Sequence, residues 1–82
     1  MKLKLNLKNQ LSEYFSGINE IYSDNNFIII VLEDEYYLES YLRELQINYY
    51  LEVNFNRPDN SIFFKKSDLN KVLKNLNGRV KK

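Results

Sequence analysis

The chain has 82 residues, a formal net charge of +1 at pH 7, and neither cysteine nor histidine. A chain of this length forms one domain with a small hydrophobic core, and its apolar fraction of 44% is typical of a folded protein. Without cysteine and histidine it has no disulfide, no thiolate nucleophile, no imidazole base and almost no route to a zinc site, so we expect a non-enzymatic protein that holds no metal and no cofactor.

The first residues predict a short strand followed by a helix. Leucines alternate with polar residues from Leu3 to Leu7, which suits a strand over 2–6. Leu7 and the apolar residues after it recur at helical spacing, so we expect a helix near 8–16 that ends at Gly17. The same leucines also fit the start of that helix, and both interpretations of 2–6 stay open.

Two strands joined by a tight turn follow. Residues 18–23 and 27–32 are rich in β-branched and aromatic side chains, and Asp24-Asn25-Asn26 between them suits a hairpin turn. The run 27–32 is apolar at every position, which is typical of a strand covered on both faces. The last helix or a second copy of the chain would supply the second cover, so a homodimer is one expectation. The run is far shorter than the roughly 20 residues of a membrane-spanning helix, and we expect no membrane association.

A helix is predicted after the second strand. Glu33-Asp34-Glu35 suits its start, because carboxylates in a first turn interact favourably with the helix dipole. Glu39 and Arg43 are spaced to form an ion pair on its outer surface. The expected apolar stripe contains Tyr37, Leu38, Tyr41, Leu42 and Leu45.

A second hairpin is predicted from the alternation of residues 49–56, in which Tyr49, Leu51, Val53 and Phe55 form the buried face of a strand. A turn at 57–60 leads to a strand at 61–66. With a loop of four residues, Glu52 lies opposite Lys65, a pair that favours this register.

The last helix is expected to begin at Ser67 and Asp68 and to end at Gly78. Its apolar stripe contains Leu69, Val72, Leu73 and Leu76. We therefore expect a single α+β domain over 1–78, followed by a basic tail at 79–82 that is disordered.

The order of elements, (β)αββαββα, predicts an α+β fold: a small two-layer sandwich in which helices pack on an antiparallel-rich sheet. Two arrangements fit this order. The first six elements match the ferredoxin-like pattern βαββαβ, with a strand and a helix appended. Alternatively, residues 32–45 align without gaps to 63–76, each after a hairpin, which gives two ββα units behind a leading helix. Neither arrangement implies a function by itself.

The near-neutral net charge hides an uneven distribution. Residues 13–56 hold nine carboxylates and only Arg43 as a base, whereas 57–82 hold eight bases and two carboxylates. This division predicts two separate partner surfaces, one acidic and one basic.

Residue usage indicates an AT-rich genome. Asparagine occurs twelve times, alanine and threonine are absent, and Phe, Tyr, Met, Ile, Asn and Lys, whose codons are AT-rich, make up half of the chain. Low-GC bacteria, their phages and their mobile elements fit this usage. Because no export signal is visible, we expect a cytoplasmic protein, in the host cell if its gene is viral.

Our leading hypothesis is a small protein of phage or mobile-element type that inhibits a larger protein by occupying its surface; anti-CRISPR proteins and other anti-defence inhibitors are of this kind. The acidic middle of the chain is suited to a basic groove that normally holds nucleic acid, and tyrosines are favoured at interfaces. The residues assigned to this protein-binding surface are Glu33, Asp34, Glu35, Tyr36, Glu39 and Tyr50.

The alternative hypothesis is a small nucleic-acid-binding regulator. Its basic patch contains Arg57, Lys65, Lys66, Lys71 and Lys74. Tyr50 and Phe63 are expected to share an exposed sheet face, where aromatic rings can stack on bases. A third hypothesis is a metal-dependent nuclease in which Glu33, Asp34 and Glu35 bind Mg²⁺ together with a carboxylate from another element, Glu20 or Glu52.

Overall fold

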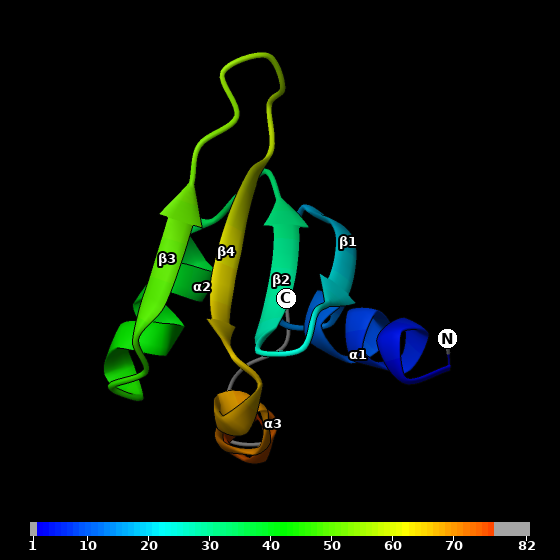
Figure 1. Ribbon diagram of the computed structural model, residues 1–82, viewed down its shortest axis with the longest axis vertical. Coiled ribbons are helices and arrows are strands. Elements are labelled where there is room, and N and C mark those ends of the chain that lie inside the picture. The colour runs from blue at the N-terminus through cyan, green and yellow to red at the C-terminus, as the bar shows by residue number, and fades with distance from the viewer. Residues whose placement is uncertain (1, 77–82) are drawn as a thin grey trace.

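Two β-hairpins provide the framework of the fold. The computed structural model describes residues 2–76. In chain order the elements are α1 (Lys2–Ser12), β1 (Ile18–Ser23), β2 (Phe27–Leu32), α2 (Tyr36–Glu44), β3 (Tyr49–Glu52), β4 (Asn60–Lys65), a 3₁₀ turn (Lys66–Asp68) and α3 (Leu69–Leu76) (Figure 1). The basic tail expected at 79–82, and the helix end expected at Gly78, lie outside the described residues.

The strands of the described chain form one antiparallel sheet in the order β1-β2-β4-β3 (Figure 1). The central strands β2 and β4 pair with each other, from Phe27 opposite Lys65 to Leu32 opposite Asn60. This pairing joins the hairpin β1–β2, which α2 follows, to the hairpin β3–β4, which α3 follows. The expected small α+β fold is therefore confirmed, and its arrangement is that of two ββα units behind a leading helix.

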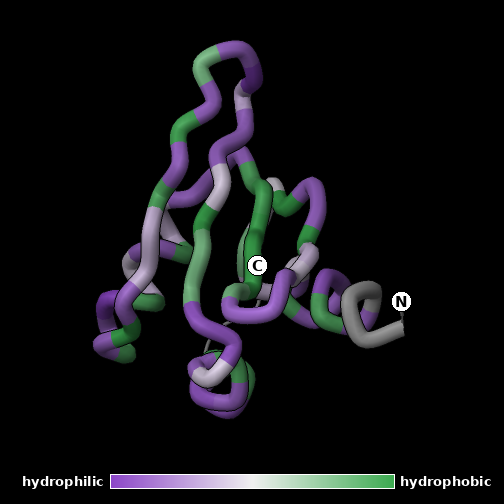
Figure 2. Tube along the Cα trace, viewed as in Figure 1, coloured by the Kyte–Doolittle hydropathy of each residue, from purple (hydrophilic) through white to green (hydrophobic). Residues whose placement is uncertain are grey.

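The helices cover one face of the sheet and leave the other open. Figure 1 looks onto the open face, with α1 and α2 behind the sheet and α3 at the end where β4 finishes. Hydrophobic residues concentrate on the central strands, whereas the β1–β2 turn is hydrophilic (Figure 2). The covered face holds the main core, which includes Leu7, Leu11, Phe15, Ile28, Ile30, Leu32, Leu38, Tyr41, Leu42, Ile62, Phe64, Val72 and Leu76.

Strand β2 is buried on both faces, as its apolar run predicts. Ile28 and Ile30 point into the core under the helices, whereas Ile29 and Val31 are buried outside that core. Ile29 lies level with a residue of β1 on one side and with Phe63 of β4 on the other. Side chains of the flanking strands in the same chain thus cover the second face of β2. The sequence had predicted the last helix or a second copy of the chain in this role.

The strand predicted at 2–6 is wrong, because these residues belong to α1. A helix that begins at Lys2 places Leu7 and Leu11 one turn apart on a single face, and both side chains are buried. The helix also ends earlier than expected, at Ser12. Local hydrogen bonds complete a helix here, whereas a strand at the chain start would need a distant partner.

The predicted register of the second hairpin is also wrong. Glu52 lies opposite Ser61 instead of Lys65, and strand β3 ends at Glu52 instead of continuing to 56. The partner of Glu52 is thus displaced by four residues, and a slip by an even number of residues leaves every side chain on the same face, so alternation cannot distinguish the two registers. The connection is longer than the expected four residues, because β3 ends at Glu52 and β4 begins at Asn60. Beyond the end of β3, the backbone N–H of Asn54 donates to Oδ1 of Asn60 (3.1 Å).

Two further details of the predicted helices can be compared with the structure. Tyr37 was assigned to the apolar stripe of α2, but its side chain is 43% exposed, and its ring packs edge-on against Tyr36 at 5.3 Å between centroids. The stripe that reaches the sheet begins one residue later, at Leu38. In α3, the predicted stripe is confirmed, with Val72 and Leu76 buried and its two other leucines partly buried against the core.

Candidate binding surfaces

The first candidate surface is the end of the sheet where β2 leads into α2. Glu33, Asp34 and Glu35 lie there, and we call these three residues the acidic end. The connection before β1 packs against them: Gly17 adopts a φ of +81°, and its carbonyl accepts a hydrogen bond from the N–H of Glu33 (3.0 Å). A Cβ at this glycine would lie 3.2 Å from the backbone nitrogen of Asp34. The close approach and the positive φ both require glycine.

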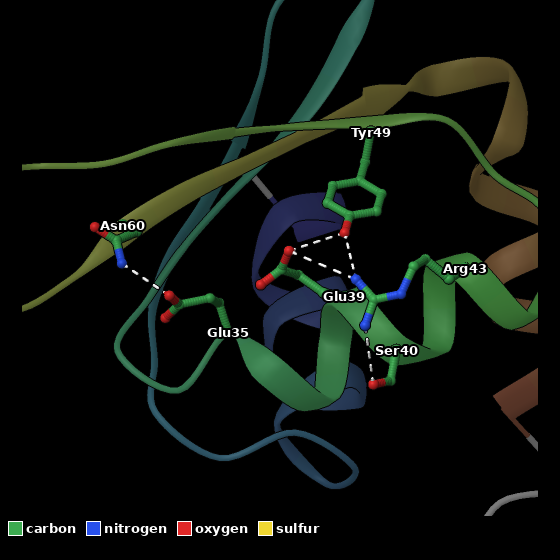
Figure 3. A network of polar contacts seen from close by, with 6 residues as sticks. All are labelled: Glu35, Glu39, Ser40, Arg43, Tyr49 and Asn60. Atoms are coloured by element: carbon green, nitrogen blue, oxygen red, sulfur yellow. Dashed lines mark hydrogen bonds and ion pairs between the residues drawn. The ribbon is translucent and has the colours of Figure 1, made fainter.

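The carboxylates of the acidic end engage three different partners. Glu33 accepts a hydrogen bond from Asn19 (3.4 Å), and Asp34 accepts one from Ser16 (3.4 Å). Glu35 accepts a bond from the amide of Asn60 at the start of β4 (3.0 Å; Figure 3). Among residues 2–76, no group of three carboxylates is placed to hold a metal ion together.

Asp59 is a buried carboxylate beside the acidic end. Its side chain is 3% exposed and accepts hydrogen bonds at Oδ2 from Asn19 (2.9 Å) and from the guanidinium of Arg57 (2.7 Å). The hydrogen bond from Asn19, followed by the bond and charge of Arg57, lowers the pKa of Asp59 below its usual value. Asn19 also bonds to Glu33, so the start of β4 and the acidic end share one partner.

Residues 53–59, which we call the finger loop, project beyond the end of the sheet (Figure 1). Phe55 is 94% exposed and Val53 is 50% exposed. The sequence predicted both side chains on the buried face of a strand, and this prediction is wrong because the strand ends before them. The turn residues that follow, Asn56 to Asp59, were the only local signal that the chain could leave the sheet this early.

Glu39 has a structural role in addition to its predicted place on the surface. The hydroxyl of Tyr49 donates to Oε1 of Glu39 (2.8 Å) and accepts from the guanidinium of Arg43 (2.8 Å), which connects α2 to β3 (Figure 3). Glu39 and Arg43 also form the expected ion pair, at 3.8 Å. Burial, and then the hydrogen bond to Glu39, raises the pKa of Tyr49 above its usual value.

The other predicted protein-binding residues lie on different faces. Tyr36 is 64% exposed at the start of α2, directly after the acidic end. Tyr50 is 67% exposed, but it lies on the open face of the sheet, opposite Phe63 of β4. The structure thus brings Tyr36 together with the carboxylates and separates Tyr50 from them.

An aromatic cluster forms the second candidate surface, on the open face. The rings of Tyr50 and Phe63 both pack edge-on around Phe27, with centroids 6.1 and 6.3 Å from it. The predicted placement of Tyr50 and Phe63 on one exposed face is confirmed. Beside the cluster, a shallow hollow is lined by Asp24, Phe27, Tyr50, Leu51, Glu52 and Phe63.

The predicted basic patch is divided between the two ends of the sheet. Lys65 ends β4 and Lys66 follows it, and both line a hollow with Phe27 and the β1–β2 turn. Two more lysines of the patch, Lys71 and Lys74, are exposed on α3. Arg57 lies at the opposite end, paired with Asp59. We call the four lysines the basic end.

No protein-family model, no curated protein sequence and no solved structure matches this chain. None of the helices in the described range has the length and apolar character needed to cross a membrane.

Proposed function

We propose that this protein is a non-enzymatic binding protein that occupies a surface of a larger protein, using the finger loop and the acidic end together. The observation that carries this proposal is Phe55, an aromatic side chain that is 94% exposed on a loop projecting from the sheet. An apolar side chain exposed to water contributes no hydrophobic free energy, whereas its burial in a pocket of a partner would be favourable because it removes apolar surface from water.

The base of the finger loop is held in place by the chain itself. Asp59 receives bonds from Arg57 within the loop and from Asn19 of β1, and the side chain of Asn60 closes the loop against the N–H of Asn54. A loop anchored in this way loses less conformational entropy on binding than a free one. Exposed aromatic anchors of this kind are frequent binding hot spots.

The charges beside the finger loop indicate the chemistry of the partner. The acidic end lies at the base of the loop, since Asn60 binds Glu35 and Asn19 bridges Glu33 and Asp59. A complementary partner has an apolar pocket surrounded by basic residues, which is the character of many nucleic-acid grooves. We therefore propose inhibition of a nucleic-acid-processing protein. Amino-acid usage typical of AT-rich genomes supports a phage or mobile-element source, for which anti-defence inhibition, including anti-CRISPR activity, is the corresponding role.

Site-specific photo-crosslinking in cells that naturally carry the gene tests this proposal. A photo-reactive phenylalanine analogue replaces Phe55 in one variant and Asn70, an exposed residue of α3, in the control. We expect the analogue at position 55 to form a covalent product with one protein, and the analogue at position 70 to form none with that protein. Equal labelling at both positions, or no product at either, would contradict the proposal.

The second candidate function, nucleic-acid binding, is favoured by one observation: Lys65 and Lys66 border a hollow that also contains the aromatic Phe27. Cations beside an exposed ring suit a single-stranded nucleic acid. This function predicts an affinity for oligonucleotides that falls linearly with salt concentration on a log–log scale and that decreases in a Lys65→Glu, Lys66→Glu variant. Negligible binding at low salt would exclude it.

A further inference from the structure

The hollow beside Lys65 and Lys66 lies between two segments that the chain fixes to each other. The β1–β2 turn forms one wall, where Oδ1 of Asp24 accepts hydrogen bonds from the backbone N–H groups of Asn26 (2.8 Å) and Phe27 (2.7 Å). The end of β4 forms the other wall, and the backbone N–H of Lys66 donates to the carbonyl oxygen of Asn26 (2.9 Å). The two walls are therefore preorganised, which lowers the entropic cost of binding a ligand between them.

Five polar side chains and one aromatic ring line this hollow. Its volume is about 410 Å³, which is in the range of small-molecule sites. The lining residues are Asn25, Asn26, Phe27, Lys65, Lys66 and Ser67. Within residues 2–76, the side-chain amides, the hydroxyl and the ammonium groups of this lining donate no hydrogen bond to the protein. A ligand that uses these donors has several hydrogen-bond acceptors, and one that also uses the ring of Phe27 has a flat apolar surface.

The segments that form the hollow carry a positive charge. Residues 24–27 and 65–74, which make both walls and the helix that follows, hold four lysines and two carboxylates, Asp24 and Asp68. Neither carboxylate is part of the lining, and Asp24 directs Oδ1 to the backbone of its own turn. The excess of lysines favours an anionic ligand, and a phosphate monoester, whose charge is close to −2 at neutral pH, matches the two lysines of the lining.

We propose that this hollow binds a single nucleotide unit. The phosphate monoester interacts with Lys65, Lys66 and the hydroxyl of Ser67, and the base packs against the ring of Phe27. Lysines alone attract any anion, whereas an aromatic ring beside them selects an anion that is attached to a planar base. Free 5′-nucleotides and the 5′-phosphorylated end of a single-stranded nucleic acid share this chemistry.

The surroundings of the hollow restrict the ligand to one unit. On the other side of Phe27, the neighbouring hollow is lined by Asp24 and Glu52, which would repel the next phosphate of a strand that crossed the open face. The nucleotide site uses the same two lysines as the second candidate function, from which the test below separates it. It leaves the finger loop, at the opposite end of the sheet, free to bind a partner protein (Figure 1).

Nuclear magnetic resonance titrations of the natural chain test this site, with the common 5′-ribonucleoside monophosphates, their nucleosides and inorganic phosphate as probes. We expect at least one monophosphate to bind with a Kd of about 1 mM or below and to shift the backbone amide signals of residues 25–27 and 65–67. The corresponding nucleoside and inorganic phosphate should each bind at least about tenfold more weakly, because each lacks one of the two groups that the hollow contacts.

Matched variants separate the hollow from general attraction by lysines. Lys65→Gln combined with Lys66→Gln should weaken binding of the monophosphate at least about tenfold. Phe27→Leu should also weaken it, but should leave the affinity for inorganic phosphate unchanged. Lys71→Gln combined with Lys74→Gln removes the same charge from α3, outside the hollow, and is the control, with an expected change of less than about twofold. Circular dichroism checks that all variants are folded.

An oligonucleotide with a 5′-phosphate and its counterpart with a 5′-hydroxyl distinguish the two sources of the ligand. Tighter binding of the phosphorylated strand than of the free monophosphate assigns the hollow to a strand end, and equal or weaker binding assigns it to a free nucleotide. No binding of any monophosphate up to about 10 mM would overturn the proposal, as would an equal loss of affinity in the α3 control. Equal affinity for both oligonucleotides, each displacing the monophosphate, would also overturn it and leave only the second candidate function.

Discussion

Asp59 connects the finger loop to the rest of the molecule through a single carboxylate oxygen. Asn19 approaches that oxygen from β1, and Arg57 approaches it from within the loop. The residue is almost fully buried although it follows a proline in a turn, a context in which aspartate is usually exposed. One of these hydrogen bonds comes from Asn19, 40 positions earlier in the chain, so no local sequence pattern could indicate it.

The lowered pKa of Asp59 predicts a pH dependence of stability. A carboxyl whose pKa is lower in the folded state contributes stability that is fully present above its ordinary pKa of about 3.9 and is lost as the pH falls through the lower folded value. We therefore expect the urea midpoint of the natural chain to decrease more steeply than that of Asp59→Asn between pH 5 and pH 2. Asp24, whose pKa is also lowered, contributes a remaining slope in both proteins. Identical pH profiles for the two proteins would contradict this role of Asp59.

A second prediction at this scale concerns Tyr41, which is 2% exposed in the core. Its hydroxyl donates a hydrogen bond of 2.5 Å to the carbonyl oxygen of Val72 and so connects α2 to α3. Tyr41→Phe removes this bond inside the protein, and we expect the free energy of unfolding to fall by about 1–2 kcal/mol in urea denaturation. Tyr36→Phe, an exposed control, should change it by less than about 0.5 kcal/mol. Equal effects of both substitutions would contradict the buried bond.

At the scale of elements, the sequence predicted most of the strands and helices because their hydrophobic patterns are periodic. The bounds of β1 and β2 agree with the prediction, since turn residues border both strands. The leading helix was misplaced because the leucines from Leu3 to Leu7 fit two periods at once. The register of the β3–β4 hairpin was missed because slips by an even number of residues keep the same faces buried.

The connection from α1 to β1 supplies a prediction for an element boundary. Gly17 has a positive φ, and a Cβ there would approach the backbone of Asp34 to 3.2 Å. We expect Gly17→Ala to lower the free energy of unfolding by about 1–2 kcal/mol, because alanine is strained in this conformation. Ser16→Ala, at the neighbouring exposed position, is the control and should have a much smaller effect. A Gly17→Ala variant as stable as this control would show that the backbone strain is absent.

At the scale of the whole molecule, the division of charge along the sequence becomes a division in space. The carboxylates of Glu33, Asp34 and Glu35 lie at one end of the sheet, and the lysines at and after the end of β4 lie at the other. The sequence predicted two separate charged surfaces, but it did not predict correctly which residues lie on each of them. Arg57, predicted in the basic patch, lies beside the acidic end because it forms an ion pair with Asp59. Tyr50, predicted on the acidic surface, lies on the open face of the sheet opposite Phe63.

The most direct test of the proposed function is quantitative capture of the partner from cells that naturally carry the gene, with the natural chain and Phe55→Ala as baits. Because Phe55 is 94% exposed, its replacement should leave the urea midpoint unchanged, which separates binding from folding. Asn70→Ala serves as the control bait. We predict one protein that the natural chain and the control both capture and that Phe55→Ala captures at least about tenfold less. Equal capture of that protein by the natural chain and by Phe55→Ala would contradict the proposed function.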